Sequence, residues 1–249
     1  MTPELRRRGL AELVGTALLV ATVVGSGIAA SRLSPGDVGL QLLENSLATG
    51  AVLVALIVAL QPVSAAFNPV VTLLERWLGV IDWRTAGTLI GAQMAGGILG
   101  AVTANLMFDL PPVTMATHAR LGPGLWLAEV VATVGLLLVI FGAVRSGRQD
   151  RVAVAVGGYI TAAYWFTSST SFANPAVTVA RMFSDTLAGI APSSVLPFIG
   201  AQLVGGAMAA LLVRMLYPRP GEDTARALTD LAADHVTARP AARPEGTAR

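Results

Sequence analysis

The chain has 249 residues, of which 54% are hydrophobic and 13% are charged, and its mean hydropathy is +0.66. A soluble domain of this length carries more charge and fewer apolar side chains, so these values indicate a protein embedded in a lipid bilayer. The lack of cysteine excludes disulfides, thiolate metal sites and a cysteine nucleophile. The seventeen basic residues are all arginine and are spread over segment ends and the tail, which argues against a nucleic-acid-binding stripe.

Six segments are long and apolar enough to cross a bilayer. They cover residues 9–30, 40–60, 84–108, 125–144, 152–168 and 195–217. The cluster Arg6-Arg7-Arg8 leads into a first segment of full bilayer length, so we expect a retained membrane helix rather than a cleaved signal peptide. Six crossings place both termini on one side, and most flanking arginines fall there. The positive-inside rule therefore predicts a multi-pass protein of the inner (plasma) membrane with cytoplasmic termini.

Two further apolar segments, 62–78 and 170–190, are too short and too interrupted to cross, and each contains an Asn-Pro pair. Non-helical backbone at membrane depth is tolerated only where protein buries it or water lines it. We therefore expect two re-entrant segments, entering from opposite sides. Residues 218–249 change to a Pro-, Ala-, Arg- and acid-rich composition, which predicts a disordered cytoplasmic tail after a channel domain of residues 1–217.

Three short motifs recur in the same order in the two halves of the chain, at offsets of 117, 106 and 109 residues. The matched pairs are Glu12 with Glu129, Asn68-Pro69-Val70 with Asn174-Pro175-Ala176, and Gln93 with Gln202. Each copy, about 9–108 and 125–217, holds three crossings, an odd number, so the second copy enters the membrane from the opposite face. Interrupted segments at matched positions of such an inverted repeat predict a permeation site where Asn68 and Asn174 meet.

An Asn-Pro pair is suited to the start of a short helix. Asn caps a helix amino terminus, and Pro is favoured in the first turn because its missing N–H costs nothing there. Two such half-helices would direct their positive dipole ends at the bilayer midplane, which opposes cations and admits neutral solutes. We expect the amides of Asn68 and Asn174 to donate hydrogen bonds to a passing oxygen atom.

With these motifs, residues 9–217 resemble the aquaporin, or major intrinsic protein, family, whose signature is a pair of Asn-Pro-Ala boxes. The resemblance implies an all-α membrane protein of six transmembrane helices and two re-entrant half-helices in an inverted 3+3 repeat. It implies a homotetramer in the lipid bilayer with one pore per subunit, and a channel rather than an enzyme. No cofactor, metal or nucleic acid is implied.

Four polar residues within the apolar spans need an explanation. A carboxylate inside a membrane is a functional hypothesis by default, and a proton-coupled transporter would need one. The family resemblance implies instead that Glu12 and Glu129 accept hydrogen bonds from backbone N–H groups of the re-entrant loops, with Gln93 and Gln202 supporting the same loops. Paired glycines are expected to allow close helix approach. They are Gly91, Gly96, Gly97, Gly200, Gly205 and Gly206.

The chain departs from the family at the selectivity filter. An arginine normally follows the second box directly, and here that position is Val177. Counting back from Asn174 places two other filter positions at Ser171 and Ala162, and the fourth falls at Ala48 or Thr49 on the second helix. Arg181, four residues after Val177, is expected to face loops or headgroups, and the alternative is that it reaches the pore. The aromatic group Tyr164, Trp165 and Phe166 is expected to anchor the protein at a membrane interface, and the alternative is that it narrows the mouth of the pore.

This lining would be wider and less polar than a water-selective filter. It predicts passive diffusion of glycerol-like polyols, urea, undissociated metalloid acids such as arsenous acid, and some water, with a filter similar to that of bacterial family members associated with arsenic resistance. A secondary active transporter with inverted repeats is the alternative, and its only candidate coupling groups are Glu12 and Glu129. A membrane-embedded enzyme has less support, since His118 lies in a loop and His235 in the tail.

Overall fold

A computed structural model describes residues 1–217, and all the regular secondary structure in that range is helical. The elements are α1 (Pro3–Leu33), α2 (Val38–Leu60), α3 (Pro69–Trp77), α4 (Trp83–Met107), α5 (Pro123–Arg145), η1 (Gln149–Arg151), α6 (Val152–Phe166), α7 (Pro175–Ala180), η2 (Arg181–Phe183) and α8 (Pro192–Leu216). The predicted cytoplasmic tail, 218–249, lies outside the described residues.

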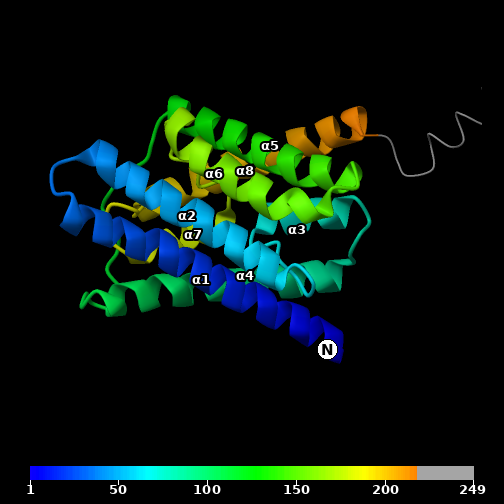
Figure 1. Ribbon diagram of the computed structural model, residues 1–249, viewed down its shortest axis with the longest axis horizontal. Helices are drawn as coiled ribbons and strands as arrows, with labels where there is room; N and C mark the ends of the chain where they lie inside the picture. Colours follow the sequence, from blue (N-terminus) through cyan, green and yellow to red (C-terminus); the bar gives the residue numbers. More distant parts are fainter. Residues whose placement is uncertain (218–249) are drawn as a thin grey trace, which may run out of the picture.

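The long helices run side by side along the longest axis of the molecule (Figure 1). Helix α1 packs on α4, α5 packs on α8, and α2 packs on α6. The first two pairs occupy equivalent positions in the two halves of the chain, and the third pair joins the halves. The short helices α3 and α7 lie between the long ones, α3 toward the end that carries the N-terminus and α7 toward the opposite, or distal, end. This is the predicted arrangement of two inverted halves with one half-helix each.

Within residues 1–217, five helices are long and apolar enough to cross a membrane: α1, α2, α4, α5 and α8. The sixth crossing was expected over 152–168, but α6 has only 15 residues and ends at Phe166. A 3₁₀ turn, η1, precedes it, and the backbone of Thr167 is extended. The residues after Phe166 therefore belong to the re-entrant segment, which begins earlier than the apolar pattern suggests.

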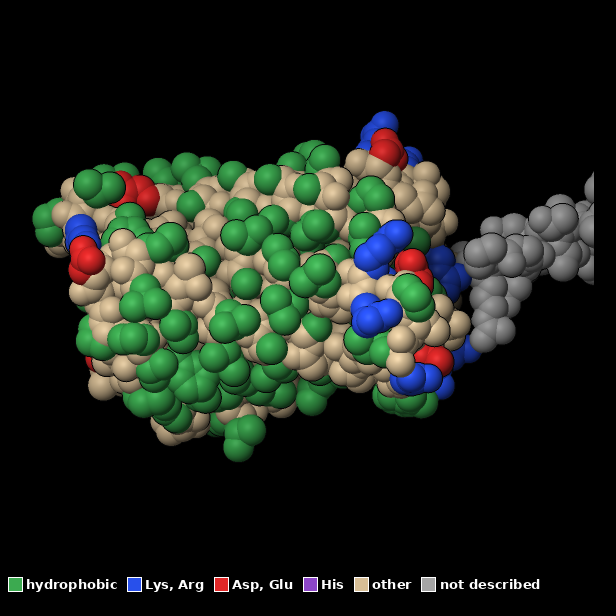
Figure 2. Space-filling model, turned by 90° about the horizontal axis from the view of Figure 1, so that it is seen from below, with side chains coloured by type: hydrophobic (Ala, Val, Ile, Leu, Met, Phe, Trp, Pro, Cys, Tyr) green, Lys and Arg blue, Asp and Glu red, His purple; other side chains and the backbone are tan. Residues whose placement is uncertain are grey.

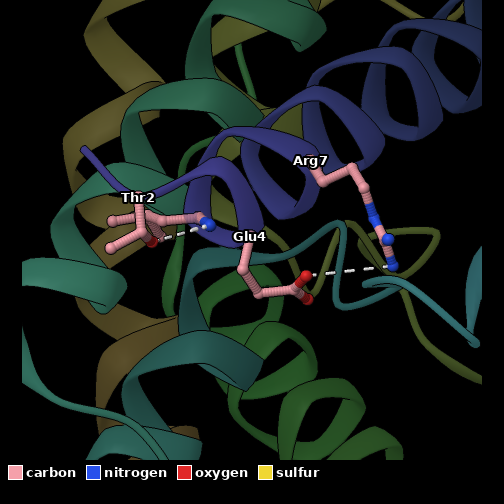
Figure 3. A network of polar contacts seen from close by, with 4 residues as sticks. Thr2, Glu4 and Arg7 are labelled. Atoms are coloured by element: carbon pink, nitrogen blue, oxygen red, sulfur yellow. Dashed lines mark hydrogen bonds and ion pairs between the residues drawn. The ribbon is translucent and has the colours of Figure 1, made fainter.

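Capping residues fix where several helices begin. The side chain of Thr2 accepts a hydrogen bond from the N–H of Leu5 at 3.2 Å, so α1 starts at Pro3 instead of residue 9 (Figure 3). On its exposed first turn, Glu4 and Arg7 form an ion pair at 3.9 Å. Asp82 caps α4 in the same way, through the N–H of Thr85 at 2.7 Å. Such caps satisfy backbone donors that a helix leaves unpaired at its first turn.

Glycine permits close approach at only some of the predicted positions. A Cβ atom on Gly96 would lie 2.2 Å from the carbonyl oxygen of Leu13, and one on Gly205 would lie 2.7 Å from that of Val130. These residues let α4 pack against α1, and α8 against α5. Gly91 and Gly200 have open space around them, so their prediction was wrong. Each lies five residues before its partner, about 140° round the helix and away from the packing face.

The outside of the bundle is mostly apolar. Figure 2 shows hydrophobic side chains spread over the length of this face, with arginines gathered mainly at the end that carries the N-terminus. Large apolar residues such as Leu18, Val58 and Leu211 are 49%, 62% and 60% exposed. A broad exposed apolar surface of this kind is what a lipid bilayer would cover.

Candidate functional site

Two fully buried carboxylates hold the re-entrant segments. Glu12 on α1 accepts hydrogen bonds from the backbone N–H groups of Ala66 at 2.9 Å and Phe67 at 2.7 Å. The hydroxyl of Ser64 and the amide of Gln93 also donate to it, at 2.5 and 2.8 Å. The two oxygens of this carboxylate together accept four hydrogen bonds, which tie α1 and α4 to the re-entrant segment. Its role here is to fix the backbone before Asn68.

The second half repeats this arrangement. Glu129 on α5 accepts from the N–H groups of Phe172 and Ala173, both at 2.9 Å, and from the amide of Gln202 at 2.7 Å. The other proton of each glutamine amide is also matched, because Gln202 donates to Thr178 at 2.8 Å and Gln93 to its equivalent Thr72 at 2.9 Å. These contacts are the loop-supporting role that the family resemblance implied for the four polar residues.

Backbone strain at two matched positions accompanies these contacts. Phe67 and Ala173, the residues directly before the two Asn-Pro pairs, have φ angles of +49° and +45°. A non-glycine residue in this left-handed region costs on the order of 1 kcal/mol or more, and it persists only where its surroundings fix it. Here the N–H of each residue is held by a buried glutamate, which supplies that constraint.

The two Asn residues face each other across the middle of the bundle. The side-chain amide of Asn68 donates to the carbonyl of Ala173 at 2.7 Å, and that of Asn174 donates to the carbonyl of Phe67 at 2.7 Å. Their Oδ1 atoms cap the half-helices, accepting from Val70 and from Ala176 at 2.9 Å. Each Asn therefore starts one half-helix and fastens the opposite strained loop, with Pro69 and Pro175 in the first turns.

One narrow cavity, about 60 Å³ in volume, contacts both Asn residues, and we call it the pore cavity. Its lining residues are Leu19, Val23, Thr49, Leu53, Asn68, Leu136, Val156, Ile160, Tyr164, Ser171, Phe172, Asn174, Val177 and Arg181. It has room for a few water molecules. Most of its walls are apolar, with a small number of hydrogen-bonding groups, and no lining residue is Asp or Glu. Glu12 and Glu129 lie behind it.

Three of the residues predicted for the filter line the pore cavity: Thr49, Ser171 and Val177. Ala48, the alternative to Thr49, does not, and the Ala162 prediction was wrong because Ala162 is exposed on the outer surface. Tyr164 lines the cavity instead, and its hydroxyl lies 3.1 Å from that of Thr49. At 3% exposure it is not the interface anchor that was expected, whereas Trp165 and Phe166 are exposed.

Arg181 also lies in the pore cavity, so the expectation that it faces loops or headgroups was wrong. It is 2% exposed, and its guanidinium lies over the ring of Phe172 at 3.5 Å from the ring centroid. Its Nε donates to the carbonyl of Ala188. Residues four apart lie on the same face of a helix, so the spacing from Val177 to Arg181 was itself the signal for this position.

Comparison with known proteins agrees with this geometry. The sequence pattern of the family described as "Major intrinsic protein" matches residues 1–171 and 127–242. The chain belongs to the major intrinsic protein family. Aquaglyceroporin AqpS of Rhizobium meliloti is 49% identical over 214 residues, which cover 86% of this chain and 91% of that protein. The lens fiber major intrinsic protein of Gallus gallus is 28% identical over 223 residues, covering 84% and 81%.

The fold is shared with a solved structure as well. The X-ray structure of the aquaglyceroporin from Plasmodium falciparum superposes with a TM-score of 0.62 at 19% identity, covering 83% of this chain and 94% of that one. Members of the major intrinsic protein family are membrane channels and not enzymes. The chain is therefore an aquaglyceroporin-like, multi-pass membrane channel through which small solutes such as glycerol and water diffuse passively.

Proposed function

We propose that this channel passes neutral solutes larger than water: glycerol-like polyols, urea and undissociated metalloid acids such as arsenous acid, along with some water. The observation that carries the proposal is the lining of the pore cavity, where long apolar walls alternate with a few donors and acceptors. Apolar walls accommodate the carbon side of a polyol, and the amides of Asn68 and Asn174 with the Thr49 and Ser171 hydroxyls exchange hydrogen bonds with its oxygens.

The width of the filter depends on Val177 in this proposal. Where the family resemblance implies an arginine, a valine side chain lines the cavity and leaves space beside it. Tyr164 is an aromatic residue of the same lining, and its hydroxyl is paired with that of Thr49. We infer that Thr49, Tyr164, Ser171 and Val177 together set the largest solute that passes.

The alternative function, a transporter coupled to protons, finds no support in the two buried carboxylates. Each is 0% exposed, lies behind the cavity wall, and accepts hydrogen bonds from a re-entrant loop. Both carboxylates are occupied in holding the re-entrant loops, and neither lines the pore cavity, where a coupling proton would have to bind. We therefore expect solutes to cross the pore cavity passively, without coupling to protons.

The orientation and assembly belong to the same proposal. We infer that both termini are cytoplasmic, because arginines concentrate at the end of the bundle that carries the N-terminus (Figure 2). The membrane is the inner (plasma) membrane of a bacterium, as the similarity to the Rhizobium protein suggests. The unit in the bilayer is a homotetramer with one pore in each subunit.

The test is stopped-flow light scattering on proteoliposomes that contain the wild type, Val177→Arg or Val177→Thr. Thr has nearly the same volume as Val, so Val177→Thr should keep the wild-type rates for glycerol, urea and arsenous acid. Val177→Arg narrows the cavity and should reduce the uptake of all three solutes at least about tenfold, while sparing part of the water flux. Unchanged solute uptake in Val177→Arg would show that Val177 does not line the constriction.

A further inference from the structure

The buried arginine at the distal end of the pore cavity has no role in the function proposed above. We infer that Arg181 is a specificity-determining residue, whose charge opposes cations and protons at the distal mouth and whose free N–H groups donate to the oxygens of neutral solutes. The filter arginine is then displaced by one helical turn, not lost. This inference rests on the proposed function for its solutes, but cation exclusion can be measured separately.

The position of the guanidinium is fixed by its neighbours. Its Nε donates to the carbonyl of Ala188, and its plane covers the ring of Phe172, which packs edge-on against Phe198 at 5.3 Å between ring centroids. Within residues 1–217, no hydrogen bond joins its two terminal nitrogens to a protein group. Since the residue lines the pore cavity, these nitrogens are donors that a passing solute can use.

Among the described residues Arg181 forms no ion pair, and the attraction that Glu129 exerts on it from a distance is opposed by the repulsion from Arg120. The ion pairs of Glu4 with Arg7 and of Asp150 with Arg151 lie at exposed positions outside the pore cavity. A second cation lies close by, since the guanidinium of Arg120 is 5.0 Å from the centroid of the same Phe172 ring and its Nε donates to the carbonyl of Gly189 at 3.1 Å. A net positive mouth in a low-dielectric wall repels cations strongly.

Arg181 differs from the residues that build the half-helices, because the inverted repeat does not duplicate it. Glu, Asn, Thr and Gln recur at matched positions in both halves, and each makes the same contacts in both. At the 106-residue offset of the half-helices, Arg181 corresponds to Glu75. Helix α3 therefore forms with a carboxylate at that place, so an arginine is not required to fold a half-helix. This difference between Arg181 and Glu75 favours a role for Arg181 in permeation at the distal mouth over a role in folding.

The experiment uses the fact that the chain has no cysteine, so Arg181→Cys introduces a single thiol into the pore cavity. Proteoliposomes with an entrapped pH dye report proton leak and, in parallel, glycerol uptake. Arg181→Cys should raise proton leak about tenfold or more, because the barrier loses one nearby unit charge. Reaction with a methanethiosulfonate that carries an ammonium group should restore exclusion, and a reagent that carries a sulfonate should not. Equal leak in wild type and Arg181→Cys, or equal effects of the two reagents, would overturn the inference.

A second pair of variants keeps the test decisive if the cysteine variant does not fold. Arg181→Gln removes the charge but retains an amide donor for Ala188, and Val177→Arg combined with Arg181→Gln returns a charge to the position that the family usually uses. The double variant should regain the proton exclusion that Arg181→Gln lacks, and failure to regain it would count against the inference. The control is Arg32→Gln, which removes an exposed cation from the C-terminal end of α1, outside the cavity lining, and should leave proton leak within about twofold of wild type. Wild-type vesicles that take up neither glycerol nor urea would refute the proposed function, but not the inference that Arg181 excludes cations, which the proton leak tests separately.

Discussion

Glu12 and Glu129, 117 residues apart in sequence, make matching hydrogen bonds to the two re-entrant segments. Each accepts two backbone N–H groups from the residues before an Asn-Pro pair, and each is approached by a glutamine from the last helix of its half. Neither touches the pore cavity. The pair thus supports the pore without taking part in permeation.

Replacement of either glutamate by glutamine should therefore destabilise the protein. The amide that replaces one carboxylate oxygen would oppose a backbone N–H donor, and leaving buried donors unpaired should cost on the order of 3 kcal/mol. Because the two sites match, Glu12→Gln and Glu129→Gln should lower the thermal unfolding temperature in detergent by similar amounts. Glu44→Gln is the control, since the Glu44 carboxylate accepts only from the hydroxyl of Ser34, at 2.8 Å. A fall in unfolding temperature for Glu44→Gln as large as that for Glu12→Gln or Glu129→Gln would contradict the supporting role of the two buried glutamates.

The Asn pair should be sensitive to a change of charge without a change of shape. Asn174→Asp keeps the oxygen that caps α7 but loses the amide that donates to Phe67, and it places a negative charge in the pore cavity. We expect slower glycerol flux and a higher cation leak, measured on proteoliposomes. Asn105→Asp, at a buried Asn that donates to the carbonyls of Pro112 and Phe183 at 3.1 Å and is absent from the cavity lining, should not raise the leak. Equal leaks in the two variants would refute the role of Asn174.

Local sequence motifs were sufficient for the parts of this structure that the repeat duplicates. The Glu, Asn-Pro and Gln positions all occur twice in the same order, and a pair of matched deviations from a simple apolar pattern has few explanations. The Asn-Pro pairs also carry their own helix-start chemistry, so α3 and α7 begin at Pro69 and Pro175 as expected. The same motifs were sufficient for the family.

The filter was harder to predict because residue counting does not measure distance in a non-helical loop. Counting back from Asn174 selected Ala162, but α6 ends at Phe166, and Thr170 and Ser171 have φ angles of +62° and +50°. A loop folded in this way changes which residue of α6 is level with the filter, and Tyr164 takes the position. The place of Arg181 was harder to predict for a different reason. It follows the last residue of α7, at the start of the turn η2, where a side chain can face either the cavity or the next loop, and it contacts both.

The corrected filter position predicts opposite outcomes for two similar substitutions. Thr49→Phe places a ring in the pore cavity, loses the contact with Tyr164, and should reduce glycerol uptake at least about tenfold. Ala162→Phe adds the same ring to an exposed position on α6 and should leave uptake close to the wild-type rate. Stopped-flow measurements of glycerol uptake by both variants test this prediction. If Ala162→Phe blocked uptake and Thr49→Phe did not, Ala162 would be the filter residue, as the sequence count predicted.

The packing of α4 on α1 predicts a difference between two glycines of one helix. Gly96→Ala would place a methyl group 2.2 Å from the carbonyl of Leu13, so the helices must separate, at a cost of about 1–3 kcal/mol. Gly91→Ala meets open space and should be neutral or slightly stabilising, because alanine favours helix. Thermal unfolding of the purified variants gives the comparison. Equal stabilities would mean that α1 and α4 do not approach as closely as described.

The central prediction is that solutes move passively through the pore cavity, past Asn68 and Asn174. The most direct test is the initial rate of glycerol uptake into proteoliposomes, measured over a wide range of glycerol concentrations with and without an imposed proton or sodium gradient. We predict a rate that rises in proportion to the glycerol gradient and is unchanged by either ion gradient. A rate that saturates at low glycerol concentration and depends on an ion gradient would contradict the account and identify a coupled transporter.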